Sequence, residues 1–178
     1  MLRLSQILLP ALLCVTLAAQ DEPGHRSPSV TMAPAVVTII RGKPGTVDLH
    51  FRIGAGFHVN SNTPSEEYLI PTTLKLEAPT DIVIGKITYP PGKDMSFAFA
   101  PDQKLNVYSG DFSVSVLVRP LAGVLPGRYA VRGELRFQAC DNAACYPPKK
   151  MPVAFDVNVA KTPPPPKKNP AQSPHVHS

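Results

Sequence analysis

Hydrophobic and polar residues alternate along most of the chain between residues 30 and 160. Apolar side chains recur at nearly every second position in four long runs: 47–53, 112–118, 129–137 and 153–159. A period of two places one face of a strand in a core and the other in solvent, as in antiparallel sheets. Three shorter apolar segments predict further strands, at 36–40, 72–76 and 82–88.

Glycine and proline separate these runs at short intervals, and no segment has the apolar periodicity of a helix. Turn-forming segments occur at 42–45, 90–92, 109–111 and 125–127. Alternating runs divided by such turns are typical of two-sheet sandwiches. The sequence therefore predicts an all-β fold, an immunoglobulin-like antiparallel β-sandwich, as one domain over residues 30–160.

The first 20 residues have the pattern of a secretory signal. Arg3 precedes an apolar run at 7–17, and the small residues of 18–20 offer a cleavage site. The run is too short to span a bilayer, so we expect residues 1–20 to be removed. We expect a short linker at 21–29 and no membrane span in the mature chain.

Export changes the cysteine count. The chain has three cysteines, and Cys14 would leave with the signal. Lipid attachment at Cys14 is disfavoured because bulky Leu12 and Leu13 stand where small residues are wanted. Cys140 and Cys145 then form the single possible pair, in a periplasmic or secreted protein whose surroundings allow disulfides.

The charge is concentrated at the two ends of the chain. The net charge is +5, and Arg3 with the three lysines of residues 161–178 supplies four of these charges. A folded part near neutrality argues against nucleic-acid binding, which needs a basic face. Residues 161–178 are rich in proline and polar side chains, and we expect a disordered tail there.

The two remaining cysteines stand four residues apart in a short loop before Pro147 and Pro148. A bridge that closes about six residues would stabilise the fold by only roughly 2 kcal/mol. A zinc site needs four ligands, and the sequence has no second cysteine pair. We expect no resident metal and no cofactor other than the disulfide itself.

The spacing leaves three interpretations open. The pair is a redox-active disulfide that exchanges with a partner thiol. Alternatively it is a structural bridge that rigidifies a recognition loop of a non-catalytic binding or assembly domain. A third interpretation is a protein that handles Cu(I), because soft thiolates select this ion.

Two segments carry a family resemblance. Residues 137–148 (FQACDNAACYPP) resemble the active-site loop of the N-terminal domain of DsbD, a periplasmic thiol:disulfide interchange protein. Residues 57–64 and 69–72 are similar to an early strand and loop of the same family. The resemblance covers about residues 30–160 and implies an immunoglobulin-like sandwich that passes electrons by thiol–disulfide exchange.

The resemblance also implies roles for individual residues. Cys145 would form the mixed disulfide with a partner, and Cys140 would resolve it. The active-site loop would further contain Asp141, Asn142, Tyr146 and Pro147. The implied partners are thioredoxin-fold proteins, with electrons supplied in trans by a membrane-bound reductase.

In better-known members an aromatic cap loop shields the cysteines. Phe97 and Phe99 are the cap candidates here, although Asp102 is the one acidic residue beside them. The present loop has four residues between its cysteines where those members have five. His58 either tunes a nearby thiol or has a structural role, and we expect His50 at the surface.

Overall fold

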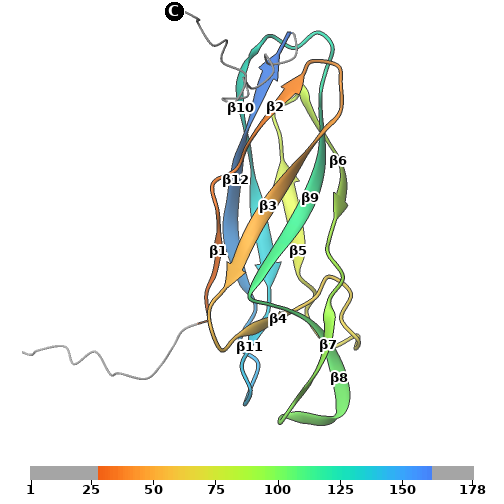
Figure 1. Cartoon of the computed structure of the whole chain (residues 1–178), viewed down its shortest axis with the longest axis vertical. Coiled ribbons are helices and arrows are strands. Elements are labelled where there is room, and N and C mark those ends of the chain that lie inside the picture. Colours follow the sequence, from red (N-terminus) through yellow and green to blue (C-terminus); the bar gives the residue numbers. More distant parts are fainter. Residues whose placement is uncertain (1–27, 162–178) are drawn as a thin grey trace, which may run out of the picture.

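The computed structural model describes residues 28–161, which form twelve strands and no helix (Figure 1). The strands are β1 (Val30–Met32), β2 (Val36–Ile40), β3 (Gly45–Ile53), β4 (His58–Asn60), β5 (Thr73–Glu77), β6 (Ile82–Thr88), β7 (Lys93–Phe97), β8 (Ala100–Ser109), β9 (Asp111–Pro120), β10 (Gly127–Phe137), β11 (Ala139–Cys140) and β12 (Lys149–Ala160). The predicted signal peptide, most of the linker and nearly all of the tail lie outside the described residues. Within 28–161, nothing has the helical length and apolarity that crossing a bilayer requires.

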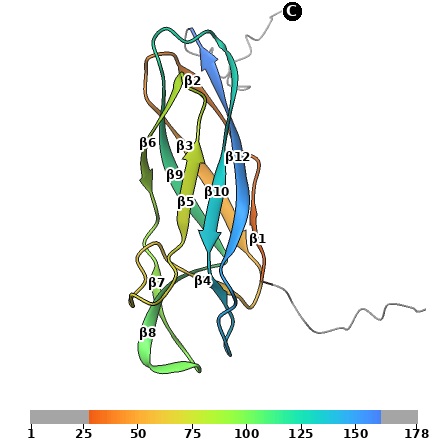
Figure 2. The ribbon, with the colours of Figure 1, turned by 180° about the vertical axis from the view of Figure 1, so that it is seen from behind.

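Two four-stranded sheets form the body of the molecule. One has the order β1-β3-β9-β6 and the other β2-β12-β10-β5, and they face each other along the long axis (Figures 1 and 2). The all-β sandwich is therefore confirmed, and each of the seven predicted runs lies in a strand of these sheets. One pairing differs from the predicted antiparallel arrangement, because β2 runs parallel to β12.

The core lies between these sheets and follows the alternation in the sequence. In β3 and β9 every second side chain is buried. Phe51 is only 1% exposed, and its ring stacks on that of Phe112 with centroids 5.2 Å apart. Aromatic pairs of this kind add to the stabilisation from burial. This stacked pair therefore strengthens the pairing of β3 with its neighbour β9.

A third sheet was not predicted. It has the order β11-β4-β8-β7 and lies at one end of the sandwich (Figure 1). Its strands β4 and β11 have only three and two residues, and β8 begins with the polar stretch 101–104. Such segments lack the apolar alternation that reveals a strand, so the expectation of two sheets was incomplete.

Three connections between consecutive strands join the sandwich to the third sheet. The chain passes from β3 to β4, from β8 to β9 and from β10 to β11 at this end of the molecule. Between β8 and β9 the bend falls at Gly110, whose φ of +65° is readily adopted only by glycine. Its carbonyl accepts a hydrogen bond from the Ile53 backbone, which ties the bend to β3.

The third sheet has a small core of its own. Leu69, Phe97, Leu105 and Val107 are buried together, and Phe99 packs against them. This cluster supports the hairpin of β7 and β8 independently of the sandwich core. The hairpin and the short β11 lie in the same sheet with β4 between them, at the end of the molecule where both cysteines lie.

Candidate functional site

The two cysteines form a disulfide at the end of the molecule that carries the third sheet. Cys140 ends β11, and Cys145 pairs with it across an isolated antiparallel bridge, with Cα atoms 3.9 Å apart. The burial of the two residues differs strongly, since Cys140 is 0% exposed whereas Cys145 is exposed. Of the two cysteines, Cys145 therefore lies at the surface, while protein atoms cover Cys140.

Asp141 organises the loop between the cysteines. Its Oδ1 accepts hydrogen bonds from the backbone nitrogens of Ala143 and Ala144, at 2.8 and 2.9 Å. Its Oδ2 accepts a hydrogen bond of 2.6 Å from the Tyr146 hydroxyl. Bonds to its charged form, first of all the one from Tyr146, hold the pKa of Asp141 below its ordinary value. The carboxylate thus stays ionised beside the disulfide and fixes the shape of the loop.

Gln138 connects the loop to the rest of the third sheet. Its Oε1 accepts hydrogen bonds from the Asn60 side chain at 3.2 Å and the Ile70 backbone at 3.4 Å. Its Nε2 donates to the Tyr146 carbonyl at 3.2 Å. One amide side chain therefore joins β4, the segment before β5 and the residue that follows Cys145.

His58 lies directly beside the disulfide. It pairs with Cys140 in the antiparallel register of β4 and β11, and it is only 3% exposed. Its ring stacks on Phe97, with centroids 3.9 Å apart and planes inclined by 14°. Phe99 is parallel to it at 6.4 Å. Both cap candidates therefore stack with the histidine that stands next to Cys140.

Burial lowers the pKa of His58 from 6.5 to about 4. The cause is the loss of hydration that the charged imidazolium would need, and the negative charge of Asp141 only partly opposes it. At neutral pH the ring is therefore uncharged. Its Nε2 is buried and has no hydrogen-bond partner in the oxidised protein.

This histidine should make the protein sensitive to mild acid. Between pH 6.5 and about pH 4 the unfolded chain binds a proton at His58 that the folded protein does not. Unfolding is therefore favoured as the pH falls through this range, by about 2 to 3 kcal/mol at pH 4. Urea unfolding at a series of pH values should show this loss in the wild type and its absence in His58→Phe.

The exposed His50 provides the matched control. His50→Gln, which removes an exposed histidine and keeps His58, should lose stability over this range as the wild type does. If His58→Phe loses as much stability as the wild type over this range, the buried neutral histidine is not the cause.

The structure brings most of the predicted site residues together. Cys140, Cys145, Asp141 and Tyr146 share the loop and its hydrogen bonds, while Asn142 and Pro147 are exposed on it. Sequence reasoning did not assign a role to Gln138 or Asn60. Both stand inside the two segments that carried the resemblance, and this was the available signal.

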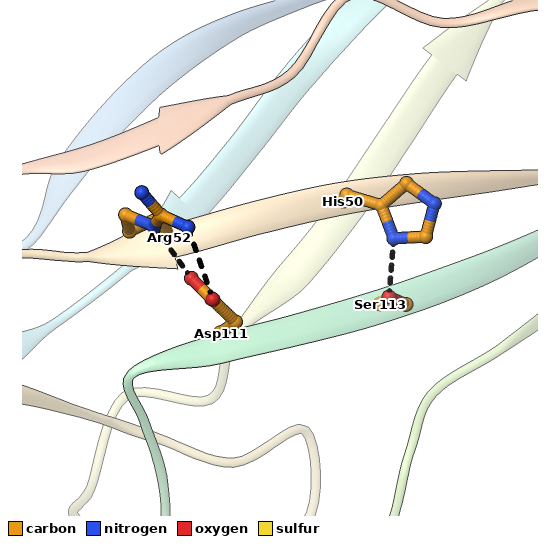
Figure 3. A network of polar contacts seen from close by, with 4 residues as sticks. All are labelled: His50, Arg52, Asp111 and Ser113. Carbon is orange, nitrogen blue, oxygen red and sulfur yellow. Dashed lines mark hydrogen bonds and ion pairs between the residues drawn. The ribbon is translucent and has the colours of Figure 1, made fainter.

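A second feature lies away from the cysteines. Arg52 and His50 on β3 face Asp111 and Ser113 on β9 (Figure 3). Arg52 donates two hydrogen bonds to the Asp111 carboxylate, at 2.7 and 3.2 Å, and His50 shares one of 2.7 Å with Ser113. These residues line an open cleft of about 780 Å³ whose lining contains neither cysteine. His50 is at the surface, as predicted.

Metal ligands do not gather in the described part of the chain. Within residues 28–161 no group of three or more His, Cys, Asp or Glu side chains is placed to hold a metal ion. The groups that the structure brings together around the disulfide are two sulfurs, one neutral imidazole and one carboxylate.

An all-β domain with a loop disulfide between one exposed and one buried cysteine is suited to exchange with thiols. The family model described as the thiol:disulfide interchange protein DsbD, N-terminal, matches residues 28–156. The chain belongs to this family of thiol:disulfide interchange domains. The resemblance found in the two sequence segments is thereby confirmed, and the domains of this family are periplasmic.

The comparison with solved structures found matches of low sequence identity and low TM-score. The reduced N-terminal domain of DsbD from Neisseria meningitidis is 20% identical to this chain, with a TM-score of 0.40. The match covers 74% of this chain and 84% of the Neisseria chain. The same domain in a complex with the PilB N-terminal domain is 21% identical, with coverages of 61% and 73% and a TM-score of 0.39. A type I cohesin from Pseudobacteroides cellulosolvens is 12% identical, with coverages of 76% and 97% and a TM-score of 0.43. No curated protein matches the chain.

Proposed function

We propose that this protein transfers electrons between thioredoxin-fold proteins by dithiol–disulfide exchange at Cys140 and Cys145. The observation that carries the proposal is the unequal burial of the two sulfurs, with Cys145 exposed and Cys140 fully covered. Membership of the DsbD N-terminal family supports the same chemistry.

Unequal burial assigns different roles to the two thiols. To load the domain, a thiolate of a reduced donor attacks the Cys145 sulfur, a mixed disulfide forms, and Cys140 leaves as the thiol or thiolate. A second donor thiol then attacks the mixed disulfide, so the donor leaves oxidised and the domain leaves as a dithiol. Two electrons have moved from the donor to this protein.

Delivery to a client reverses these roles. The Cys145 thiolate attacks a client disulfide, and one client sulfur leaves as a thiolate that takes up a proton. Cys140 then attacks the Cys145 sulfur, which restores the internal disulfide and releases the client as a dithiol. The exposed loop is the docking end in both directions, because it is the only part of the pair that a second protein can reach.

Localisation and organisation are part of the proposal. The protein would act in the periplasm after removal of residues 1–20, with residues 30–160 as the exchange domain and 161–178 as a disordered tail. Electrons would come from a membrane-bound reductase in trans. Phe97 and Phe99 would form the cap, since both stack with the histidine that adjoins Cys140.

The test is direct exchange with a thioredoxin-fold protein. The reduced exported protein is mixed with oxidised thioredoxin, and samples quenched in acid are separated by mass. We expect the disulfide to exchange between thioredoxin and the Cys140–Cys145 pair until their potentials are balanced, and this equilibrium to be reached faster than glutathione disulfide oxidises the same pair. If thioredoxin remains fully oxidised while glutathione disulfide reacts, the protein does not serve thioredoxin-fold partners.

A further inference from the structure

Three side chains lie in a row across the edge of the third sheet. His58 is the register partner of Cys140, and Cys140 in turn is the bridge partner of Cys145. Residues directly opposite each other in an antiparallel pair project to the same face, with Cβ atoms about 4.5 to 5.5 Å apart. The imidazole therefore stands on one side of the Cys140 side chain and Cys145 on the other.

The imidazole has a polar atom that the oxidised protein leaves unused. His58 is 3% exposed, and its Nε2 has no hydrogen-bond partner. Buried polar atoms without a partner are uncommon because their desolvation is not repaid. A disulfide cannot satisfy this atom, since neither sulfur carries a proton. Reduction gives Cys140 an S–H group, which is a donor.

We propose that His58 is the general base for Cys140: its Nε2 takes the Cys140 thiol proton when Cys140 resolves a mixed disulfide on Cys145. The inference rests on the proposed function, because it concerns the second step of the same exchange. It assigns to His58 a role that neither the cysteine spacing nor the loop sequence specifies.

The proposed step balances in atoms and charge. In the mixed disulfide, Cys145 is bonded to a partner sulfur and Cys140 is a thiol. As the Cys140 proton moves to Nε2, the Cys140 sulfur attacks that of Cys145, and the bond from Cys145 to the partner sulfur breaks. The partner sulfur leaves as a thiolate and is protonated by the imidazolium or by water. Over the two steps of the exchange the partner gains two electrons, and the two cysteines lose them.

The surroundings favour a neutral base that becomes charged only during the step. The ionisable groups around the ring are the two cysteines, the Asp141 carboxylate, whose charge acts on the imidazole, and Tyr146, which is bonded to Asp141. The residues that face it from β8 and β7 are Ser109 and Phe97, and neither is charged. Because burial lowers the pKa of His58 to about 4, the ring is neutral at every pH above about 5, and an imidazolium formed during the step is a strong acid that passes its proton on at once.

This base predicts an unusual pH profile for the resolving step. An unassisted thiol attacks as its thiolate, so its rate rises roughly tenfold per pH unit below its pKa. With neutral His58 as an internal base, the wild-type rate should vary less than about threefold between pH 5.5 and 7.5, because a general base acts in its deprotonated form.

The two steps can be separated with 5,5′-dithiobis(2-nitrobenzoic acid) in a stopped-flow spectrometer. The reduced exported protein, in which Cys14→Ser removes any third thiol, first releases one nitrothiobenzoate in proportion to the reagent concentration. Resolution by Cys140 then releases a second one at a rate independent of that concentration. The first phase reports attack by Cys145, and the second phase reports Cys140.

Two substitutions at His58 distinguish a base from a packing residue. His58→Phe keeps a ring against Phe97, and His58→Gln keeps a hydrogen-bond acceptor, but neither side chain takes up a proton. In both we expect the second phase at pH 6 to slow by at least about tenfold and to rise with pH, with the first phase unchanged. His50→Gln should leave both phases as in the wild type.

The outcomes are distinct from failure of the proposed function. A second phase that is equally fast and equally flat with pH in the wild type and in His58→Gln overturns the general base. Slowing of the first phase alone also overturns the general base, because it would mean that His58 acts on Cys145 and not on Cys140. Absence of a concentration-independent phase in the wild type would instead contradict exchange through the pair. Each variant is used only if its oxidised form melts as one transition and its disulfide forms fully.

Discussion

Cys145→Ser should abolish disulfide exchange, whereas Cys140→Ser should turn the protein into a trap that stays covalently bound to its partner. Both variants lose the disulfide, whose contribution to stability is roughly 2 kcal/mol in a loop of this size. They differ in which sulfur remains. In Cys140→Ser the exposed thiol still attacks, and this protein has no second thiol to resolve the product, so close to one partner should be held per protein molecule when the partner also lacks its second active-site cysteine.

The trap is measured by mixing each variant with thioredoxin whose second active-site cysteine is replaced by serine and whose remaining cysteine carries a nitrothiobenzoate as leaving group, and by separating the products on a non-reducing gel. Mass spectrometry of the cross-linked peptide then identifies the attacking cysteine. Ala143→Ser, an exposed change in the same loop, serves as the control and should exchange like the wild type. A trapped complex that forms through Cys140 in Cys145→Ser, and not through Cys145, would reverse the assignment.

Phe97→Ala should have the largest effect on stability among the residues around the site. Phe97 is 7% exposed in the small core of the third sheet, and it covers the ring of His58 at 3.9 Å. Removing a buried phenyl ring typically costs about 3 to 5 kcal/mol. We expect a loss near 3 kcal/mol, because this cluster lies at the end of the molecule and can partly collapse.

The same substitution should change the titration of His58. Once Phe97 no longer covers it, water reaches the imidazole, and its pKa should move from about 4 towards 6.5. Urea unfolding gives the stability, and the ring proton shifts in an NMR titration give the pKa. Phe99→Ala is the matched control: this ring is only half-buried and 6.4 Å from His58, so both effects should be smaller. Equal effects of the two substitutions would refute Phe97 as the specific cover of His58.

The sandwich could be predicted from the sequence because its long strands bury alternate side chains. The strands β3, β9, β10 and β12 are nine to twelve residues long, and each buries one face. The third sheet could not be predicted in this way. Its shortest strands, β4 and β11, are too short to show a period. Strand β8 starts with polar residues that are not part of the small core.

The site was predicted in its chemistry but not in its surroundings. Two cysteines remaining after export, within a loop that resembles one family, pointed to the correct pair. The burial of His58 depends on its pairing with Cys140, which is far away in the sequence, and on a ring from β7. Contacts between distant segments leave no local pattern, so the buried histidine emerged only from the fold.

The central claim, that the Cys140–Cys145 disulfide is redox-active, is tested most directly by its reduction potential. The exported protein is equilibrated in a series of dithiothreitol or glutathione buffers, and the fraction of reduced pair is measured after acid quenching and alkylation. The account predicts a potential above roughly −300 mV, with equilibrium reached quickly once thioredoxin is added. A potential well below roughly −300 mV, together with slow exchange, would identify a structural bridge and contradict the account.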